Sequence, residues 1–336
     1  MAKKKKNNTN PQQGDQPQQQ KKESFMHKLM TRKPLGFAGL IILIVILFIA
    51  IFADVLAPYP MEDGTMQTDI LNTLAKPSKE HLLGTDNLGR DVLSYLIYGA
   101  RTSAVLAIAC TLITTTISVL LGTLSAVIGG WFDLIVQRIV EAIMCIPGTV
   151  FLLILMSMLG NGMPQLIAAI SIPGGITGSR GMRANAFTVK DAGYVRNSEM
   201  LGCTTWWKTI HHVIPNMMPM IIIGACGSIG GVVMQEAGMN FLGYGVKIGT
   251  PSWGYMITNQ GRANMYAYPM LAVYPGICIS VMVFAATMFG DALRDLLDPR
   301  LQGGAGTYNA AKLDKFKQEM MEQYHPEELA AEQAKS

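Results

Sequence analysis

The sequence carries little charge for its length. Only 15% of its 336 residues are Asp, Glu, Lys or Arg, whereas 50% are hydrophobic, and the mean hydropathy is +0.28. Soluble domains average about 25% charged residues. The composition therefore excludes an ordinary soluble protein and predicts a membrane protein. The net charge of +4 is modest, and the basic residues gather at the N-terminus and between Arg180 and Lys208, so we expect no nucleic-acid partner.

The residue patterns of several enzyme classes are also absent. No Gly-Lys dipeptide occurs, so the sequence has no P-loop to hold the phosphates of ATP. No H-E-x-x-H motif and no cluster of Ser, His and Asp marks a catalytic centre. The five cysteines stand singly, which predicts neither a disulfide nor a metal site. We therefore expect no catalytic residue, no metal site and no cofactor bound by this chain. Our interpretation is that the chain is not an enzyme.

Long apolar runs fill the middle of the chain. A helix needs about 20 apolar residues to cross a bilayer, and six runs meet that need. Gly160–Pro164 interrupts a charge-free stretch between the third and fourth runs and predicts a helical hairpin there. The predicted spans are Gly36–Ala57, Thr102–Ile128, two within Ala142–Ser179, Pro215–Gln235 and Met270–Phe289.

The flanking segments predict the domain limits and the orientation. Residues 1–33 are rich in Lys, Asn, Gln and Pro and are expected to form a disordered tail. Lys and Arg collect in this tail and after the fourth span, which predicts that both termini and that loop lie in the cytoplasm. Segments 58–101 and 236–269 are then outside. The predicted units are the tail 1–33, a membrane domain 34–301 with a core at 102–291 and a loop at 180–214, and a charged tail 302–336.

The segment Gly193–Asn216 is a polar, helix-prone loop between two apolar runs. Its first half has helical spacing and ends at Gly202, and its second half carries an apolar stripe that begins at Trp206. The pattern is therefore helix, glycine break, helix. Taken alone, such a loop is either an amphipathic elbow at the membrane surface or a contact for a partner.

Three further motifs lie beside the spans. HLLGTDNLGRDVLSYLIYGARTS runs from His81 to Ser103, QEAGMNFLGYGVKIGTPSWGYMI from Gln235 to Ile257, and GDALRDLLDPRL from Gly290 to Leu301. Taken singly, the glycines of the first motif predict turns, its charges a solvated loop, and the charges of the last an ion network on a helix surface. The residues concerned are Gly84, Thr85, Asp86, Gly89, Arg90, Asp91, Gly99 and Arg101 in the first motif, and Gly290, Asp291, Arg294, Asp298, Pro299 and Arg300 in the last.

In this order, the motifs resemble those of ABC transporter permease subunits of the dipeptide, oligopeptide and nickel importer family. The Gly202 loop resembles the family's EAA loop, which closes here with Ile214, Pro215 and Asn216. The resemblance implies an all-α integral membrane protein of the bacterial cytoplasmic membrane, with six transmembrane helices in the type I ABC importer permease fold. It also implies that the loop couples to an ATPase, through Tyr194, Val195, Arg196, Ser198, Glu199, Leu201, Gly202, Cys203 and Trp206.

The same resemblance implies the partners and the cargo. The partners would be a sister permease in a heterodimer, two ABC ATPase subunits that bind ATP and Mg, an extracytoplasmic solute-binding protein, and membrane lipid. Arg196 stands where the family's loop has a glutamate, and Tyr95 where an arginine is typical of the outer motif. We expect a di- or oligopeptide cargo, with nickel as the alternative within the family.

A gradient-driven secondary transporter is the alternative from a different class. Such carriers place several ionisable groups inside their spans. Glu141 and Glu236 are the candidates in this sequence, and both stand near span ends, where such residues can be interfacial. The sequence therefore favours the ATP-driven importer.

Overall fold

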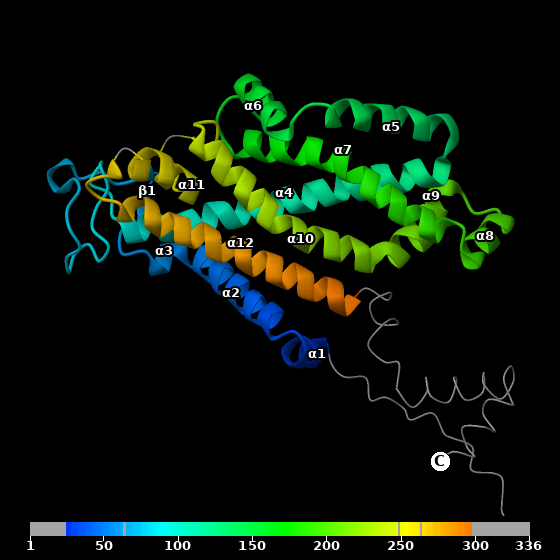
Figure 1. The fold of residues 1–336 in the computed structure, drawn as a ribbon, viewed down its shortest axis with the longest axis horizontal. Coiled ribbons are helices and arrows are strands. Elements are labelled where there is room, and N and C mark those ends of the chain that lie inside the picture. Colours follow the sequence, from blue (N-terminus) through cyan, green and yellow to red (C-terminus); the bar gives the residue numbers. More distant parts are fainter. Residues whose placement is uncertain (1–24, 63–64, 248, 263, 298–336) are drawn as a thin grey trace, which may run out of the picture.

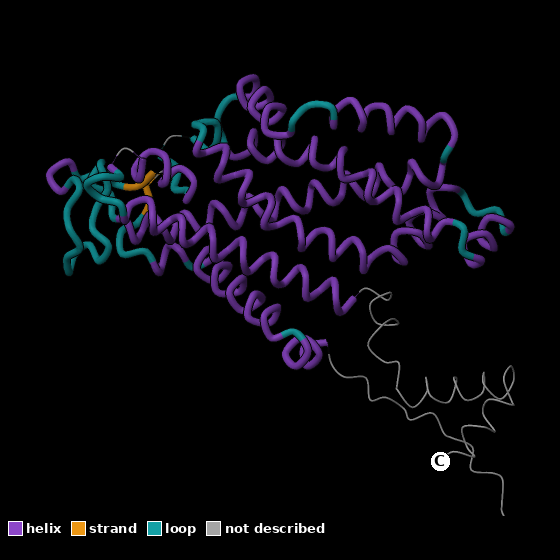
Figure 2. The backbone as a smooth tube through the Cα atoms, in the orientation of Figure 1, coloured by secondary structure: helices purple, strands orange, loops and turns teal. Residues whose placement is uncertain are grey.

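The computed structural model describes residues 25–297, apart from 63–64, 248 and 263, and is almost entirely helical (Figures 1 and 2). Long helices lie side by side along the longest axis of the molecule (Figure 1). The described elements are α1 Phe25–Arg32, α2 Pro34–Ile51, α3 Ala53–Leu56, β1 Met61–Glu62, β2 Thr65–Met66, the 3₁₀-helix η1 Ile70–Asn72, α4 Val92–Ile128, α5 Gly130–Met144, α6 Gly148–Leu159, α7 Met163–Lys190, α8 Gly193–Met200, α9 Thr205–Lys208, the π-helix η2 Thr209–Val213, α10 Ile214–Phe241, α11 Trp253–Tyr255, the π-helix η3 Met256–Arg262 and α12 Met270–Leu297.

Among the described residues, four helices are long and apolar enough to cross a membrane: α2, α4, α12 and the continuous helix Thr205–Phe241 that joins α9, η2 and α10. The bent pair of α5 and α6 makes a fifth span if it is counted as one. Helix α7, expected as the fourth predicted span, has 28 residues but is less apolar than these four. Each predicted span thus corresponds to helix in the bundle, and the all-α membrane fold is confirmed.

The third predicted span is not one straight helix. Helices α5 and α6 meet at an angle of 90°, and Pro147 takes the N-cap position of α6. A proline restrains the residue before it from helical geometry, so the chain turns there. The prediction began this span at Ala142 because Asp133, Arg138 and Glu141 interrupt the apolar pattern of α5. The predicted break at Gly160–Pro164 is confirmed, since α6 ends before Gly160 and α7 begins at Met163.

Three boundaries also differ from the prediction. Helix α4 begins at Val92 rather than Thr102, so part of the outer motif is helical. Helix α10 continues to Phe241 and takes Glu236 into the bundle. Residues 25–32, expected in the disordered tail, form α1, because Met26, Leu29 and Met30 share one helix face and Leu29 is buried. Residues 1–24 and the predicted tail 302–336 lie outside the described residues.

Small residues allow helices α2, α10 and α12 to approach closely. A Cβ added to Gly36 would lie 2.0 Å from the Cβ of Ala292, so α2 and α12 touch nearly backbone to backbone. A Cβ on Gly290 would lie 3.1 Å from the Cα of Gly227, which joins α12 to α10 in the same way. Close contact of this kind is typical of helices that pack within a membrane.

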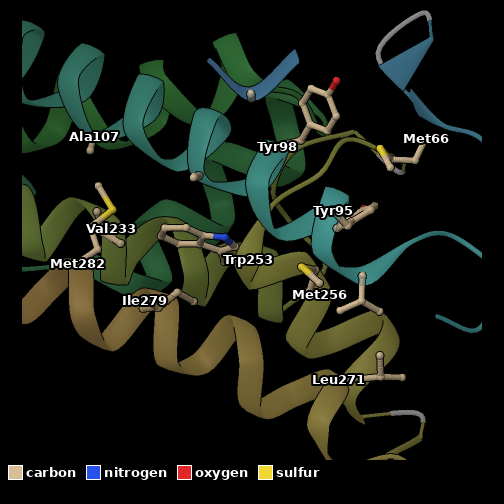
Figure 3. Close-up of a cluster of buried hydrophobic side chains, with 13 residues drawn as sticks. Met66, Tyr95, Tyr98, Ala107, Val233, Trp253, Met256, Leu271, Ile279 and Met282 are labelled. Atoms are coloured by element: carbon tan, nitrogen blue, oxygen red, sulfur yellow. The ribbon is translucent and has the colours of Figure 1, made fainter. Parts of the chain in front are cut away.

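The two ends of the bundle are built differently. One end carries β1, η1 and α11, and beside it lies a buried cluster of large side chains that includes Tyr95, Tyr98, Trp253, Met256 and Leu271 (Figure 3). The opposite end carries α8 (Figure 1). The start of α2 and the end of α12 point toward the α8 end (Figure 1). The two chain ends of the described bundle therefore share one side with the Gly202 loop.

Candidate functional site

Gly202 ends α8 in a left-handed conformation, with φ of 81°. Its N–H donates to the carbonyl of Glu199 at 3.0 Å, and the N–H of Cys203 donates to the carbonyl of Ser198 at 3.1 Å. These two bonds form a Schellman motif, which favours glycine at this position. A Cβ on Gly202 would meet no atom within 4 Å, so backbone conformation alone requires the glycine. The predicted helix, glycine, helix pattern is confirmed.

The residues predicted for this loop divide between two faces. Val195 and Ser198 are buried, and Val195 packs in a cluster with residues of α4, α7 and α10. Met200 and Leu201 are 79% and 85% exposed at the tip. Lys208 is buried and donates to the Glu199 carboxylate at 3.1 Å, which fastens α9 to α8. The remaining predicted residues, Tyr194, Arg196, Glu199, Gly202 and Trp206, are exposed, and Cys203 is half-buried.

A half-buried ion pair joins α7, the helix that leads into this loop, to α5, and the sequence did not predict it. Arg183 of α7 holds Asp133 of α5 through two hydrogen bonds of 2.6 Å. The hydroxyl of Ser125 on α4 donates to the same carboxylate. Lys190, at the end of α7, donates to the carbonyl of Ala126 at 3.1 Å. Helix α7, which leads into the loop, is therefore tied to α4 and α5. The only sequence signal was the run of basic residues.

Three charged residues of the outer motif, Asp86, Arg90 and Asp91, are buried, so their interpretation as a solvated loop is wrong. Asp86 and Arg90 are 1% and 3% exposed. The Arg90 Nε donates to Asp86 at 2.7 Å, and the Gln260 side-chain amide donates to the same oxygen at 2.6 Å. The Arg90 guanidinium lies 4.6 Å from the ring centre of Tyr95. Tyr95, which replaces the family's arginine, thus provides a cation–π contact in place of a second charge.

Asp91 begins α4. Its carboxylate accepts hydrogen bonds of 2.8 Å from both the N–H and the hydroxyl of Ser94, and its other oxygen lies 3.0 Å from His81 Nδ1. The hydroxyl of Thr85 accepts a bond of 2.8 Å from the N–H of Ala75. The outer motif therefore holds the segment before α4 in a fixed shape.

The glycines of the outer motif have two roles. Gly84 and Gly89 have φ of 81° and 74°, which confirms the predicted turns. Gly99 is instead helical, and a Cβ there would lie 2.7 Å from the Trp253 ring. Arg101 follows on α4 and pairs with Asp54 at 2.8 Å.

The exit motif is described only in part. Gly290 makes the close contact of α12 with α10, and Asp291 and Arg294 are exposed. Asp298, Pro299 and Arg300 lie outside the described residues, as does the predicted network through Asp298. Among the described residues, an ion pair of 2.5 Å joins Lys33 to Asp295 at this end.

Glu236 is 1% exposed, so its side chain lies inside the bundle and does not face the membrane interface, the place that the sequence left open to it. Its carboxylate accepts bonds of 2.7 Å from the Ser252 hydroxyl and 2.6 Å from the Asn240 amide. The Ser103 hydroxyl lies 3.4 Å from the second oxygen. Glu236 therefore links α10 to α4 and to Ser252, just before α11. Sequence periodicity did not reveal this, because Ser103 and Ser252 lie outside α10.

A cavity of about 670 Å³ lies between the bend of α5 and α6 and helices α7 and α10. Its wall is mostly aliphatic, and no Asp, Glu, Lys or Arg lies among the described lining residues. Within the part of the chain that the structure describes, no three His, Cys, Asp or Glu side chains gather as they do around a metal ion.

Comparison with known proteins assigns the family. The family described as binding-protein-dependent transport system inner membrane component matches residues 118–303, which include α7, the Gly202 loop and α10. The chain belongs to this ABC importer permease family. The N-terminal TM domain of oligopeptide transport permease C also matches, over residues 27–77.

Relatives are similar over most of this ABC importer permease. The oligopeptide transport system permease protein OppC of Bacillus subtilis is 34% identical over 268 residues, 80% of this chain and 86% of the relative. The glutathione transport system permease protein GsiD of Pectobacterium atrosepticum is 32% identical over 278 residues, 83% and 91% of the two chains. The GsiD of Escherichia coli O157:H7 is 31% identical over 272 residues, 81% and 88%.

These matches confirm the resemblance and the fold class. The protein is an integral membrane permease of the type I ABC importer fold, of the oligopeptide and glutathione type. It is a transport component, and its family implies ATPase and substrate-binding partners. Gln260, Glu236 and the Asp133–Arg183 pair join the residues that hold its shape.

Proposed function

We propose that this permease forms the pore of an ATP-driven importer of di- or oligopeptides, as a heterodimer with a sister permease. Two ATPase subunits bind ATP and Mg, and an external solute-binding protein delivers the peptide. The match of residues 27–77 to oligopeptide transport permease C supports this cargo. So do the relatives, whose names refer to oligopeptide and to glutathione, a tripeptide.

The coupling role rests on one observation, the apolar tip of the Gly202 loop. Met200 and Leu201 expose most of their side chains beyond the bundle, while Val195 and Ser198 anchor the same short helix. Exposed apolar groups on a firmly held helix are suited to a groove on a partner protein. The hydrogen bond between Lys208 and Glu199 holds α9 against α8. Because α9 continues through η2 into α10, a displacement of α8 by a partner would be transmitted to α10. The ATPase is the partner that this proposal assigns to the tip.

The same geometry supports the proposed orientation. The described chain ends lie toward the α8 end of the bundle. The basic residues of the sequence collect in residues 1–33 and between Arg180 and Lys208, which lie next to α2 in the chain and within the Gly202 loop region. Positive residues favour the cytoplasmic side. Both termini and the loop therefore lie in the cytoplasm, and the end that carries β1, η1 and α11 receives the loaded binding protein from outside.

Reconstitution tests this function. The chain would be placed in liposomes with its co-encoded sister permease, ATPases and binding protein, and uptake of a labelled tripeptide would be measured. Uptake should require ATP on the side of the membrane that carries the ATPases, and should cease when ADP replaces ATP. It should persist when ionophores remove ion gradients. Uptake that depends on a gradient and not on ATP would contradict the proposal. Uptake of Ni²⁺ but of no peptide would contradict the cargo alone.

A further inference from the structure

The cavity beside the α5–α6 bend has the size of a ligand site and an uncharged wall. Its volume of about 670 Å³ falls within the roughly 300–1,000 Å³ that small-molecule sites occupy. Aliphatic and methionine side chains form most of the wall. Its polar side chains are Thr149 of α6, Thr177 of α7 and Gln235 of α10.

Gln235 is a polar residue in this mostly apolar wall, and contact with lipid does not account for it. Its side chain is exposed and lines the cavity, and it forms no hydrogen bond with another described residue. An amide inside a membrane span that lacks a partner is costly in hydrocarbon, so such groups face protein, water or a polar path. Gln235 therefore indicates that the cavity holds polar material during function.

The opposite wall adds an uncharged acceptor. The Thr177 hydroxyl donates to the carbonyl of Pro173 at 2.9 Å, which leaves its oxygen free to accept. The cavity thus offers amide and hydroxyl groups, and its described lining residues carry no ionic group.

We propose that this cavity is this chain's half of the peptide path and that Gln235 binds the peptide main chain there. The inference rests on the proposed function. A primary amide both donates and accepts, so it can pair with a peptide unit whatever the side chains are. A wall without charge favours neither acidic nor basic peptides. The three lining methionines, Met144, Met234 and Met239, can repack around different side chains.

The cavity lining suits a nickel ion less well than it suits a peptide. Ni²⁺ in proteins favours imidazole and related nitrogen ligands, whereas the described lining has neither histidine nor carboxylate. Among the cargoes of the proposed importer, the cavity therefore matches an amide-bearing solute.

Labelling tests the path independently of cargo. Gln235→Cys and Phe284→Cys, the latter exposed on α12 and not part of the cavity lining, would be made in a chain whose five cysteines are replaced by alanine. The assembled complex in open membrane fragments would be treated with a charged, membrane-impermeant maleimide. The Gln235→Cys chain should react at least tenfold faster. Equal rates would overturn the proposal.

Uptake of three tripeptides tests the role of the amide in the native cysteine background. Gln235→Leu should lower uptake of Ala-Ala-Ala, Ala-Lys-Ala and Ala-Asp-Ala by a similar factor of about five, the effect of one lost hydrogen bond. Gln235→Glu should lower uptake of the acidic peptide relative to the basic one by roughly tenfold, because like charges repel. The binding protein is the same in all assays, so a changed ratio arises in the permease.

The outcomes separate the two proposals. An unchanged acidic-to-basic ratio in Gln235→Glu, with native uptake by Gln235→Leu in equal amounts of complex, would overturn the assignment of Gln235. If the native complex imports none of the three peptides although Gln235→Cys is labelled, the peptide cargo fails and the polar path remains supported.

Discussion

The side-chain amide of Gln260 donates a hydrogen bond of 2.6 Å to the carboxylate of Asp86, although 174 residues separate them in the chain. The same carboxylate oxygen accepts a bond from Arg90. This relationship fastens the segment before α4 to η3, the π-helix before α12. The outer end of the permease is therefore one connected unit, made of segments from both halves of the sequence.

Asp86→Ala should strongly destabilise this end. The substitution leaves Arg90 buried without its counter-charge, a change that costs about 3–5 kcal/mol at buried pairs. We expect the purified protein to lose its monodisperse peak at a lower temperature than the native chain, measured by heating in detergent followed by size-exclusion chromatography. Glu80→Gln, at an exposed position of the same segment, should change little and serves as the control. Equal loss in both variants would contradict the account.

Two glycine substitutions should differ in severity. Gly202→Ala meets no atom and incurs only the cost of a left-handed residue, about 1 kcal/mol, so the chain should fold. Gly122→Ala puts a Cβ 2.5 Å from the carbonyl oxygen of Ser179, so α4 and α7 must separate. The same heating assay should rank Gly122→Ala as the less stable variant. The reverse order would show that the loop, and not the α4–α7 contact, limits stability.

Gly99 and Trp253 should show coupled effects. Gly99→Ala places a Cβ 2.7 Å from the Trp253 ring, which is buried and donates to the carbonyl of Leu96 at 2.9 Å. The substitution should destabilise the native chain by about 1–3 kcal/mol. In a Trp253→Ala background the clash is absent, so the added effect of Gly99→Ala should fall to below about 0.5 kcal/mol. Additive effects of the two changes, measured by the same heating assay, would contradict the contact.

The features that followed from the sequence are those that depend on neighbouring residues. The apolar runs of α2, α4 and α12 predicted spans because a helix buries its length in lipid. The break at Gly202 was predicted because a helix end needs a residue that adopts a left-handed conformation. The hairpin at Gly160 followed from similar local turn chemistry.

The features that the sequence did not reveal depend on distant contacts. Asp86, Arg90 and Glu236 are residue types that are usually solvated. In the structure they are buried, and Gln260 and Ser252 from later segments pair with Asp86 and Glu236. The charged residues of α5 made this helix unlike a membrane span in the sequence. In the structure Arg183 of α7 pairs with Asp133 of α5, so the charge of Asp133 is neutralised. Periodicity along one segment carries no information about such partners.

The central claim is that the exposed tip of the Gly202 loop binds the ATPase, and Leu201→Asp tests it most directly. Leu201 is 85% exposed, so the change should leave the fold intact. Leu71→Asp, at a position 94% exposed at the opposite end, is the matched control. Each variant would be purified from membranes with the co-encoded sister permease and ATPases, and the retained ATPase would be quantified. We predict at least a tenfold loss of ATPase for Leu201→Asp and native retention for Leu71→Asp; native retention by both variants would contradict the claim.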